Sequence, residues 1–138
     1  MHLYFVYFCT RIKVTSGTEY KRLNYLFPMY TVIKRMEVSA AHSLKLSYSS
    51  KCENLHGHNW IITVYCRSKE LNADGMVIDF SHIKEIIKSK LDHQNLNEVL
   101  PFNPTAENIA RWICDQLPTC YKVEVKESES NTAIYEKD

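Results

Sequence analysis

The chain has 138 residues, of which 45% are hydrophobic and 24% are charged, and its formal net charge is +1. This length fits one domain with a buried core, and the composition is that of an ordinary globular protein. Lys and Arg are scattered rather than clustered, so the charge pattern does not favour nucleic acid or a membrane surface as a partner. No apolar run approaches the roughly 20 residues needed to span a bilayer.

The cysteines indicate a reducing compartment. They are odd in number, irregularly spaced and contain no C-x-x-C pair, which argues against a disulfide framework and for a cytoplasmic protein. The apolar stretch 3–9 has no Lys or Arg before it and no small-residue cleavage site after it, so we do not expect a signal peptide. The five cysteines are Cys9, Cys52, Cys66, Cys114 and Cys120.

The first 28 residues differ from the rest. They show no sustained period, and Pro28 precedes a clear strand pattern that opens at Met29. We therefore expect an N-terminal extension over 1–28, outside the fold, and one domain over 29–138. The alternative is an additional edge strand at 3–8.

Three stretches favour β-strands. In residues 30–42 the buried-type residues from Met36 onward share a parity that His42 continues. Residues 56–66 repeat the alternation, and a short strand is expected at 76–80, after a glycine turn. Alternation of this kind is typical of strands with one buried face.

Two helices and two further strands follow. Apolar residues at helical spacing predict a helix up to Leu91, with Asp79 or Ser81 as its N-cap, and a second helix from about Thr105 to Pro118. Strands are expected over 121–127 and 132–136. The order β, β, β, α, α, β, β predicts an α+β architecture with helices on one face of an antiparallel sheet.

His56-Gly57-His58 is the strongest local signal of chemistry. Histidines at i and i+2 of a strand point to the same face, and His42, at the end of the preceding strand, can lie beside them. Three imidazoles with an open fourth position are typical of a catalytic zinc site. The alternative is three hydrogen-bonded histidines near a turn.

Other candidate residues each have an ordinary structural alternative. Cys52, in the polar loop before His56, can act as a proton acceptor or be inert; Asp92 beside His93 can form an acid–base pair or a solvated helix end. The parity of Glu127 places a carboxylate on a buried face, where it suits two N–H donors of a 2-amino-pyrimidinone ring. Its alternative is a solvated residue after a strand that ends at Lys126.

Six short motifs together resemble the 6-pyruvoyl tetrahydropterin synthase family, which includes the 6-carboxytetrahydropterin synthases of queuosine biosynthesis. They occur in family order between residues 30 and 135. The motifs are Ala40-Ala41-His42, Cys52-Glu53-Asn54-Leu55-His56-Gly57-His58-Asn59, Val77-Ile78-Asp79-Phe80, Leu91-Asp92-His93, Pro104-Thr105-Ala106-Glu107-Asn108 and Val125-Lys126-Glu127-Ser128.

The resemblance implies a fold, an assembly and a set of roles. The fold is the tunnelling fold, a four-stranded antiparallel sheet with two helices on one face, whose sheets close into a barrel. Two trimers form a homohexamer with active sites at subunit interfaces. The implied roles are zinc ligands for His42, His56 and His58, proton transfer for Cys52, Asp92 and His93, and pterin binding for Glu127, with Thr105 and Glu107 near the same pocket.

The resemblance also implies the reaction. A zinc lyase would convert 7,8-dihydroneopterin triphosphate to 6-carboxy-5,6,7,8-tetrahydropterin, releasing acetaldehyde and triphosphate. The short spacing from Cys52 to His56 favours this branch over the 6-pyruvoyl enzymes. Glu53 stands where a third branch, which makes 6-hydroxymethyl-7,8-dihydropterin, has a glutamate, so it is a possible second base, or else a loop carboxylate. The alternative from another class is a catalytically inactive zinc-binding oligomer.

Overall fold

The computed structural model describes residues 28–138. The expected N-terminal extension, and the alternative edge strand at 3–8, fall on residues outside this range and stay predictions. Within the described range, no helix is long and apolar enough to cross a membrane.

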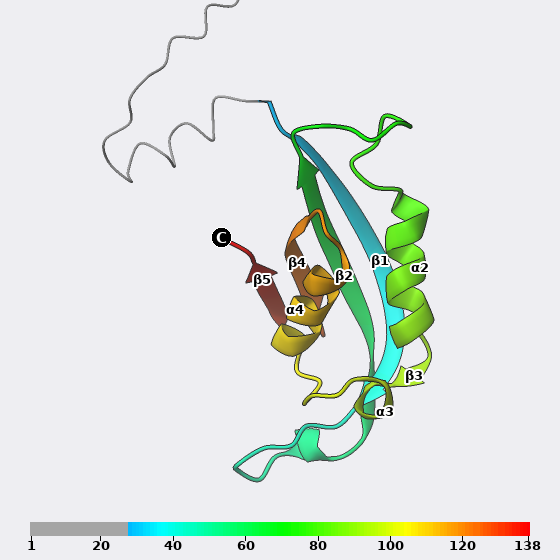
Figure 1. Cartoon of the computed structure of the whole chain (residues 1–138). Coiled ribbons are helices and arrows are strands. Elements are labelled where there is room, and N and C mark those ends of the chain that lie inside the picture. Colours follow the sequence, from blue (N-terminus) through cyan, green and yellow to red (C-terminus); the bar gives the residue numbers. More distant parts are fainter. Residues whose placement is uncertain (1–27) are drawn as a thin grey trace, which may run out of the picture.

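Four long strands form an antiparallel sheet, as the sequence predicts. A fifth strand of two residues, β3, pairs in parallel with the outer edge of β1, so the order is β3-β1-β2-β4-β5 (Figure 1). The antiparallel neighbours are β1 with β2, β2 with β4, and β4 with β5. The strands are β1 (Tyr30–His42), β2 (His56–Ser68), β3 (Gln94–Asn95), β4 (Cys120–Lys126) and β5 (Thr132–Glu136).

The two long helices cover one face of this sheet. Helix α2 (Phe80–Leu91) packs against β1, and α4 (Ala106–Gln116) packs against β4 and β5 (Figure 1). A one-turn helix, α3 (Leu96–Val99), lies between them in sequence, and a short 3-10 helix, η1 (Lys51–Glu53), lies in the loop that joins β1 to β2. The predicted α+β fold with helices on one face is confirmed.

The prediction of a short strand at 76–80 is wrong. Residues 76–79 form an irregular connection, and Phe80 is the first residue of α2. Before it, the side chain of Asn72 accepts hydrogen bonds from the N–H groups of Asp74 and Met76, which builds a turn instead of a strand. The apolar residues that suggested a strand, Val77 and Ile78, are half-buried against the core, so their hydrophobicity reflects packing of a connection.

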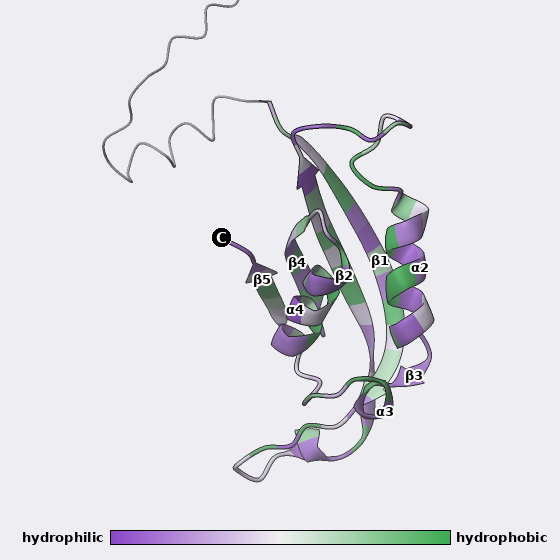
Figure 2. Cartoon of the chain, in the orientation of Figure 1, coloured by the Kyte–Doolittle hydropathy of each residue, from purple (hydrophilic) through white to green (hydrophobic). Residues whose placement is uncertain are grey.

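The core lies between the sheet and the helices. Alternate residues of β1, β2 and β4 are buried, and hydrophobic and hydrophilic residues accordingly alternate along the strands (Figure 2). Burying a large aliphatic side chain contributes about 1.5–3 kcal/mol, so this layer is the main source of stability. The largest fully buried apolar side chains are Trp60, Ile62, Ile83, Ile87, Leu91, Leu96, Ile109, Ile113 and Leu117.

Both predicted helix caps are present. The carboxylate of Asp79 accepts a hydrogen bond from the N–H of Ser81 at 2.7 Å, so Asp79 and not Ser81 is the N-cap of α2. The hydroxyl of Thr105 accepts a hydrogen bond from the N–H of Asn108 at 3.2 Å at the start of α4. Each cap satisfies a backbone donor that the first helical turn leaves without an intrahelical partner.

We expect Asp79→Ala to lower the free energy of unfolding by about 1 kcal/mol, because alanine cannot accept the Ser81 hydrogen bond. Asp79→Asn is the matched control and should cost only a few tenths of a kcal/mol, since asparagine caps helices about as well as aspartate. Urea unfolding of the three proteins measures this difference. Equal destabilisation by both substitutions would show that the charge of Asp79 matters rather than its cap.

Candidate metal centre and active site

Three histidines meet at the end of the β1–β2 hairpin. Strand pairing sets His42 directly opposite His56 and Ala40 opposite His58, so all three rings share the face of the sheet that carries the core. Each ring offers one nitrogen, and these atoms lie within 4.8 Å of one another. His42 is fully buried, and the other two are half-buried. The structure therefore brings together the three predicted metal ligands.

Hydrogen bonds orient two of the rings. Nδ1 of His42 lies 2.8 Å from the carbonyl oxygen of Pro104, and Nδ1 of His56 lies 2.8 Å from that of Asn54. A carbonyl can only accept, so Nδ1 carries the proton in both rings and Nε2 keeps a free lone pair. Nε2 of His42 and Nε2 of His58 are buried and have no hydrogen-bond partner in residues 28–138.

The surroundings favour the neutral form of His42 and His58. Burial lowers the pKa of His42, and the hydrogen bond to the Pro104 carbonyl opposes this without reversing it. Burial likewise lowers the pKa of His58. The indole of Trp60 packs edge-on against both rings and adds apolar surface. Neutral, buried imidazoles with free Nε2 lone pairs are the donors that a zinc ion binds.

Glu127 lies beside the histidines. Strand β4 ends at Lys126, one residue earlier than predicted, yet Glu127 keeps the parity of the buried Val123 and Val125. Its Oε1 is 3.4 Å from Nε2 of His42 and 3.6 Å from Nε2 of His58, and 24% of its side chain is exposed. A carboxylate therefore stands at the edge of the histidine cluster, half accessible to a ligand.

One pocket of about 480 Å³ contains all three residues predicted to bind substrate. Glu127 and Glu107 line it together with Thr105, the N-cap of α4. Leu44 and Tyr48, from the loop after β1, line the same pocket. The pocket thus has an acidic character and an apolar wall next to the histidines, which suits a flat ring with N–H donors.

Cys52 and Glu53 belong to η1, in the loop between β1 and β2. Cys52 is half-buried, and its N–H donates to the hydroxyl of Ser50 at 3.2 Å. The carboxylate of Glu53 is exposed and accepts the N–H of Ser50 at 3.0 Å, which completes a capping box. Glu53 therefore has a local structural role in this turn, and action as a base would require it to leave that contact.

Asp92 and His93 follow directly after the C-terminal end of α2, beside β1. Asp92 is the C-cap residue of α2; its carboxylate accepts the N–H of Ser39 at 3.0 Å, and Lys88 donates to it at 3.2 Å. His93 lies 3.3 Å from Asp92 through its Nδ1, and 82% of its side chain is exposed. Its φ of 58° is in the left-handed region, a strained conformation for a histidine that is held by the hydrogen bond from its N–H to the Ser39 carbonyl.

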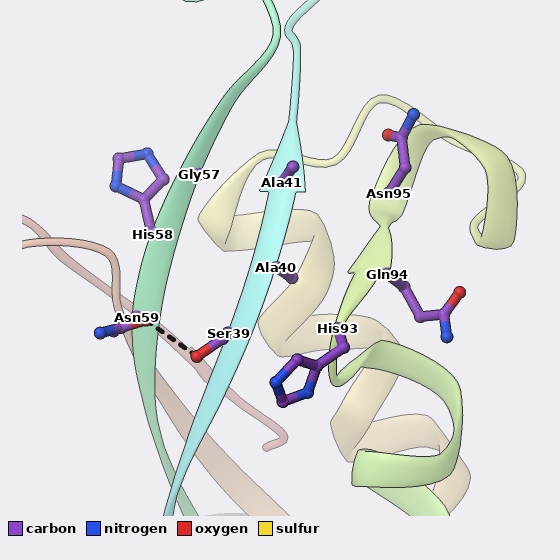
Figure 3. A pocket seen from close by; sticks show the side chains of 9 residues that line it. All are labelled: Ser39, Ala40, Ala41, Gly57, His58, Asn59, His93, Gln94 and Asn95. Atoms are coloured by element: carbon purple, nitrogen blue, oxygen red, sulfur yellow. Dashed lines mark hydrogen bonds between the residues drawn. The ribbon is translucent and has the colours of Figure 1, made fainter.

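His93 lines a different pocket from Glu127. This pocket, of about 580 Å³, is shallow and includes Ser39 of β1 and Asn59 of β2, whose side chains share a hydrogen bond (Figure 3). The ring of His93 extends from the end of α2 toward β1 (Figure 3). His58 of the histidine cluster also lines this pocket, whereas the predicted substrate-binding residues Glu127, Thr105 and Glu107 line the other one.

Comparisons with known proteins identify the family. The family model for 6-pyruvoyl tetrahydropterin synthase matches residues 31–138, which is most of the chain. The chain belongs to this family. It is 35% identical over 127 residues to the 6-pyruvoyl tetrahydrobiopterin synthase of Dictyostelium discoideum, covering 75% of this chain and 94% of the relative.

One further relative and one solved structure support the same family assignment. The 6-carboxy-5,6,7,8-tetrahydropterin synthase of Bacillus subtilis is 29% identical over 119 residues, covering 74% of this chain and 82% of that protein. The solved structure of Caenorhabditis elegans 6-pyruvoyl tetrahydropterin synthase superposes with a TM-score of 0.66 at 28% identity, covering 81% of this chain and 98% of that one. The predicted family resemblance is confirmed, and with it a pterin-processing enzyme family.

The sequence analysis did not identify several residues that position the histidine cluster and the chain beside it. The Pro104 carbonyl orients His42, and the side chains of Asn97 and Asn103 bind the chain just after β1. Each of these contacts joins residues more than 50 positions apart, so local spacing contains no signal for them. Pro104 lies in the motif Pro104-Thr105-Ala106-Glu107-Asn108, but the motif alone does not indicate a role for its backbone carbonyl.

Lys88 should control the ionisation of Asp92. Burial favours a raised pKa for this carboxyl, but the hydrogen bonds from Ser39 and Lys88 outweigh it, and the pKa of Asp92 is lowered from 3.8. A depressed pKa adds stability above the unfolded value, and this stability is lost as the pH falls through the folded pKa. The Lys88–Asp92 pair therefore stabilises the protein at neutral pH and not in acid.

We expect Lys88→Met to raise the pKa of Asp92 and to reduce the loss of stability on acidification. Carboxyl titration by NMR, with urea unfolding at neutral and at acid pH, measures both effects. Lys84→Met, at an exposed position of the same helix, is the matched control and should change neither. An unshifted Asp92 titration in Lys88→Met would contradict the assignment.

Proposed function

We propose that this protein is a zinc-dependent lyase that converts 7,8-dihydroneopterin triphosphate to 6-carboxy-5,6,7,8-tetrahydropterin, releasing acetaldehyde and triphosphate. The observation that carries the proposal is a cluster of three histidines beside the half-exposed carboxylate of Glu127, in a chain of this family. His42, His56 and His58 would hold the zinc ion. A zinc ion bound there supplies Lewis-acid polarisation of the substrate's side-chain hydroxyl groups.

Glu127 is assigned as the pterin anchor. A carboxylate can accept two parallel N–H donors, as a 2-amino-pyrimidinone ring presents them. Because Glu127 lies 3.4 Å from His42, a ring held by this carboxylate has its side chain next to the metal centre. Thr105 and Glu107, in the same pocket, are the further substrate-binding residues of the proposal.

Cys52 is assigned as the base that removes the proton from C1′ of the substrate side chain, with Asp92 and His93 as its proton-transfer partners. Within one chain His93 lines a separate pocket and is almost fully exposed, which supports an active site completed by a neighbouring subunit. We therefore propose a homohexamer, a dimer of trimers, whose sheets close into a barrel. The lack of a disulfide framework in the sequence supports a cytoplasmic location.

The choice of product rests on the loop that contains Cys52. Four positions separate Cys52 from His56, the spacing that favours the 6-carboxy branch, to which the queuosine enzymes belong. Relatives with the 6-carboxy name and with the 6-pyruvoyl name both match the chain, so 6-pyruvoyl tetrahydropterin synthesis is the second candidate. Two further alternatives remain. Glu53 would support a second activity that makes 6-hydroxymethyl-7,8-dihydropterin, or the protein would be a catalytically inactive zinc-binding oligomer.

The purified protein should contain one zinc ion per chain, and His56→Ala should lose most of it, because two remaining imidazoles bind zinc far more weakly than three. His82→Ala is the matched control: His82 is an exposed histidine on α2 and should leave the zinc content unchanged. Metal analysis after dialysis makes the measurement. Stoichiometric zinc in His56→Ala would disprove this ligand set.

Cys52 and Glu53 should differ in the products that they support. Cys52 and Glu53 are neighbours in the 3-10 helix η1, where three residues make one turn and adjacent side chains point about 120° apart, so each group would face a different proton of one substrate. We expect Cys52→Ala to abolish formation of 6-carboxytetrahydropterin while leaving some 6-hydroxymethyl product, and Glu53→Ala to do the reverse.

Mass spectrometry of the products at equal zinc occupancy tests this pair. If Glu53→Ala behaves like the unmodified enzyme and no 6-hydroxymethyl product is formed, Glu53 has only its capping role. Release of a 6-pyruvoyl product by the unmodified enzyme would favour the second candidate instead.

A further inference from the structure

Two of the three residues that follow β1, Ser43 and Lys45, are held by asparagine side chains. Ser43 comes directly after His42, at the point where pairing of β1 with β2 stops. The N–H of Ser43 donates to Oδ1 of Asn97 at 2.7 Å, and Nδ2 of Asn97 donates to the carbonyl of Ser43 at 2.8 Å. One amide side chain thus satisfies both backbone groups of Ser43, as a neighbouring strand would.

The same pairing is repeated two residues later. The N–H of Lys45 donates to Oδ1 of Asn103 at 2.9 Å, and Nδ2 of Asn103 donates to the carbonyl of Lys45 at 3.0 Å. Ser43 and Lys45 have the same parity, so both present their backbone groups to one edge of the extended chain. Asn97 and Asn103 occupy that edge, and we call the two side chains the asparagine clamp.

Leu44 faces the opposite edge and contacts the segment that bears Cys52. Its N–H donates to the carbonyl of Cys52 at 2.8 Å. This hydrogen bond therefore closes the loop that joins β1 to β2, and the base of this loop lies near α3 (Figure 1). Any shift of Leu44 moves the backbone acceptor of Cys52 with it.

Both clamp residues are themselves held in place by hydrogen bonds to neighbouring residues. Asn97 is in the first turn of α3, where its N–H donates to the side chain of Asn95 at 3.2 Å. The carbonyl of Asn103 accepts a hydrogen bond from the side chain of Asn108 in α4 at 3.0 Å. Pro104, adjacent to Asn103, supplies the carbonyl that orients His42. The connection between α3 and α4 therefore supplies two contacts to the site: the Pro104 carbonyl orients His42, and Asn103 binds Lys45 in the chain that leads to Cys52.

We propose that Asn97 and Asn103 are positioning residues that set the place of Cys52 relative to the three histidines. The catalytic part of this inference rests on the proposed function, since it assumes that Cys52 reacts with a substrate held at the histidines. Its structural part does not: the clamp fixes a half-buried thiol through two hydrogen-bonded edges of residues 43–45. Loss of either asparagine leaves two backbone groups without their partners and loosens the segment.

The first experiment measures alkylation of Cys52 by iodoacetamide in the full-length protein, with the labelled peptide quantified by mass spectrometry. Asn97→Ala and Asn103→Ala should each raise the rate at Cys52 at least about fivefold, because local opening exposes the half-buried thiol. Asn72→Ala is the matched control. Asn72 also accepts two backbone hydrogen bonds, from Asp74 and Met76, but in the connection between β2 and α2.

The second experiment measures turnover of 7,8-dihydroneopterin triphosphate by the same variants at equal zinc content. We expect kcat to fall about 10-fold to 100-fold in both clamp variants, since a misplaced base slows the chemical step. KM should rise only a few-fold, because Leu44 is one wall residue of a pocket whose Glu127, Thr105 and Glu107 are unchanged. Asn72→Ala should lower the thermal midpoint without changing kcat. A purely structural role for the clamp would instead lower stability alone.

The outcomes separate the two proposals. Unchanged Cys52 alkylation in both clamp variants overturns the clamp, whatever the enzyme activity. Faster alkylation with unchanged kcat also overturns it, because Cys52 then needs no positioning. If the unmodified enzyme has no turnover, the proposed function fails, and the alkylation rates still decide whether the clamp holds Cys52. A clamp variant that does not fold is replaced by Asn97→Asp or Asn103→Asp, which keeps the acceptor and loses the donor.

Discussion

The whole site depends on the pairing register of β1 and β2. Their antiparallel ladder continues without interruption from Tyr30 opposite Ser68 to His42 opposite His56. A slip of one residue would turn every side chain of one strand to the other face, and His42 would point away from His56 and His58. The same parity buries Val38 and Trp60, so the hydrophobic core and the histidine cluster are specified by one register.

Burial of His42 has a free-energy cost that a bound ion or ligand would offset. His42 is fully buried with an Nε2 that has no hydrogen-bond partner in the described chain, an arrangement that costs free energy unless an ion or ligand satisfies it. Burial also keeps the ring neutral, which is the form that binds metal. Glu127 adds a negative charge at the open side, where an ion or a ring with N–H donors would meet it.

The proposed site is built from three groups of residues with different supports. The histidines are on the rigid hairpin, whereas Cys52 is in a loop whose position depends on the asparagine clamp and on Leu44. Asp92 and His93 form a third group at the end of α2, anchored to β1 through Ser39. The strained backbone of His93 and its exposed ring support the proposal that this residue acts in the site of a neighbouring subunit.

The sequence by itself determined the long strands, the two helices with their caps at Asp79 and Thr105, and the shared face of the histidines, because all of these follow from local periodicity and capping chemistry. It failed at 76–80, where apolar residues pack a connection, since hydrophobicity does not distinguish a strand from a buried loop. Only the tertiary structure decided that Glu127 reaches His42, that the Pro104 carbonyl orients that ring, and that Asn97 and Asn103 hold the chain after β1. These contacts join segments far apart in the chain, and their geometry depends on packing of α3 and α4 against the sheet, which no local pattern encodes.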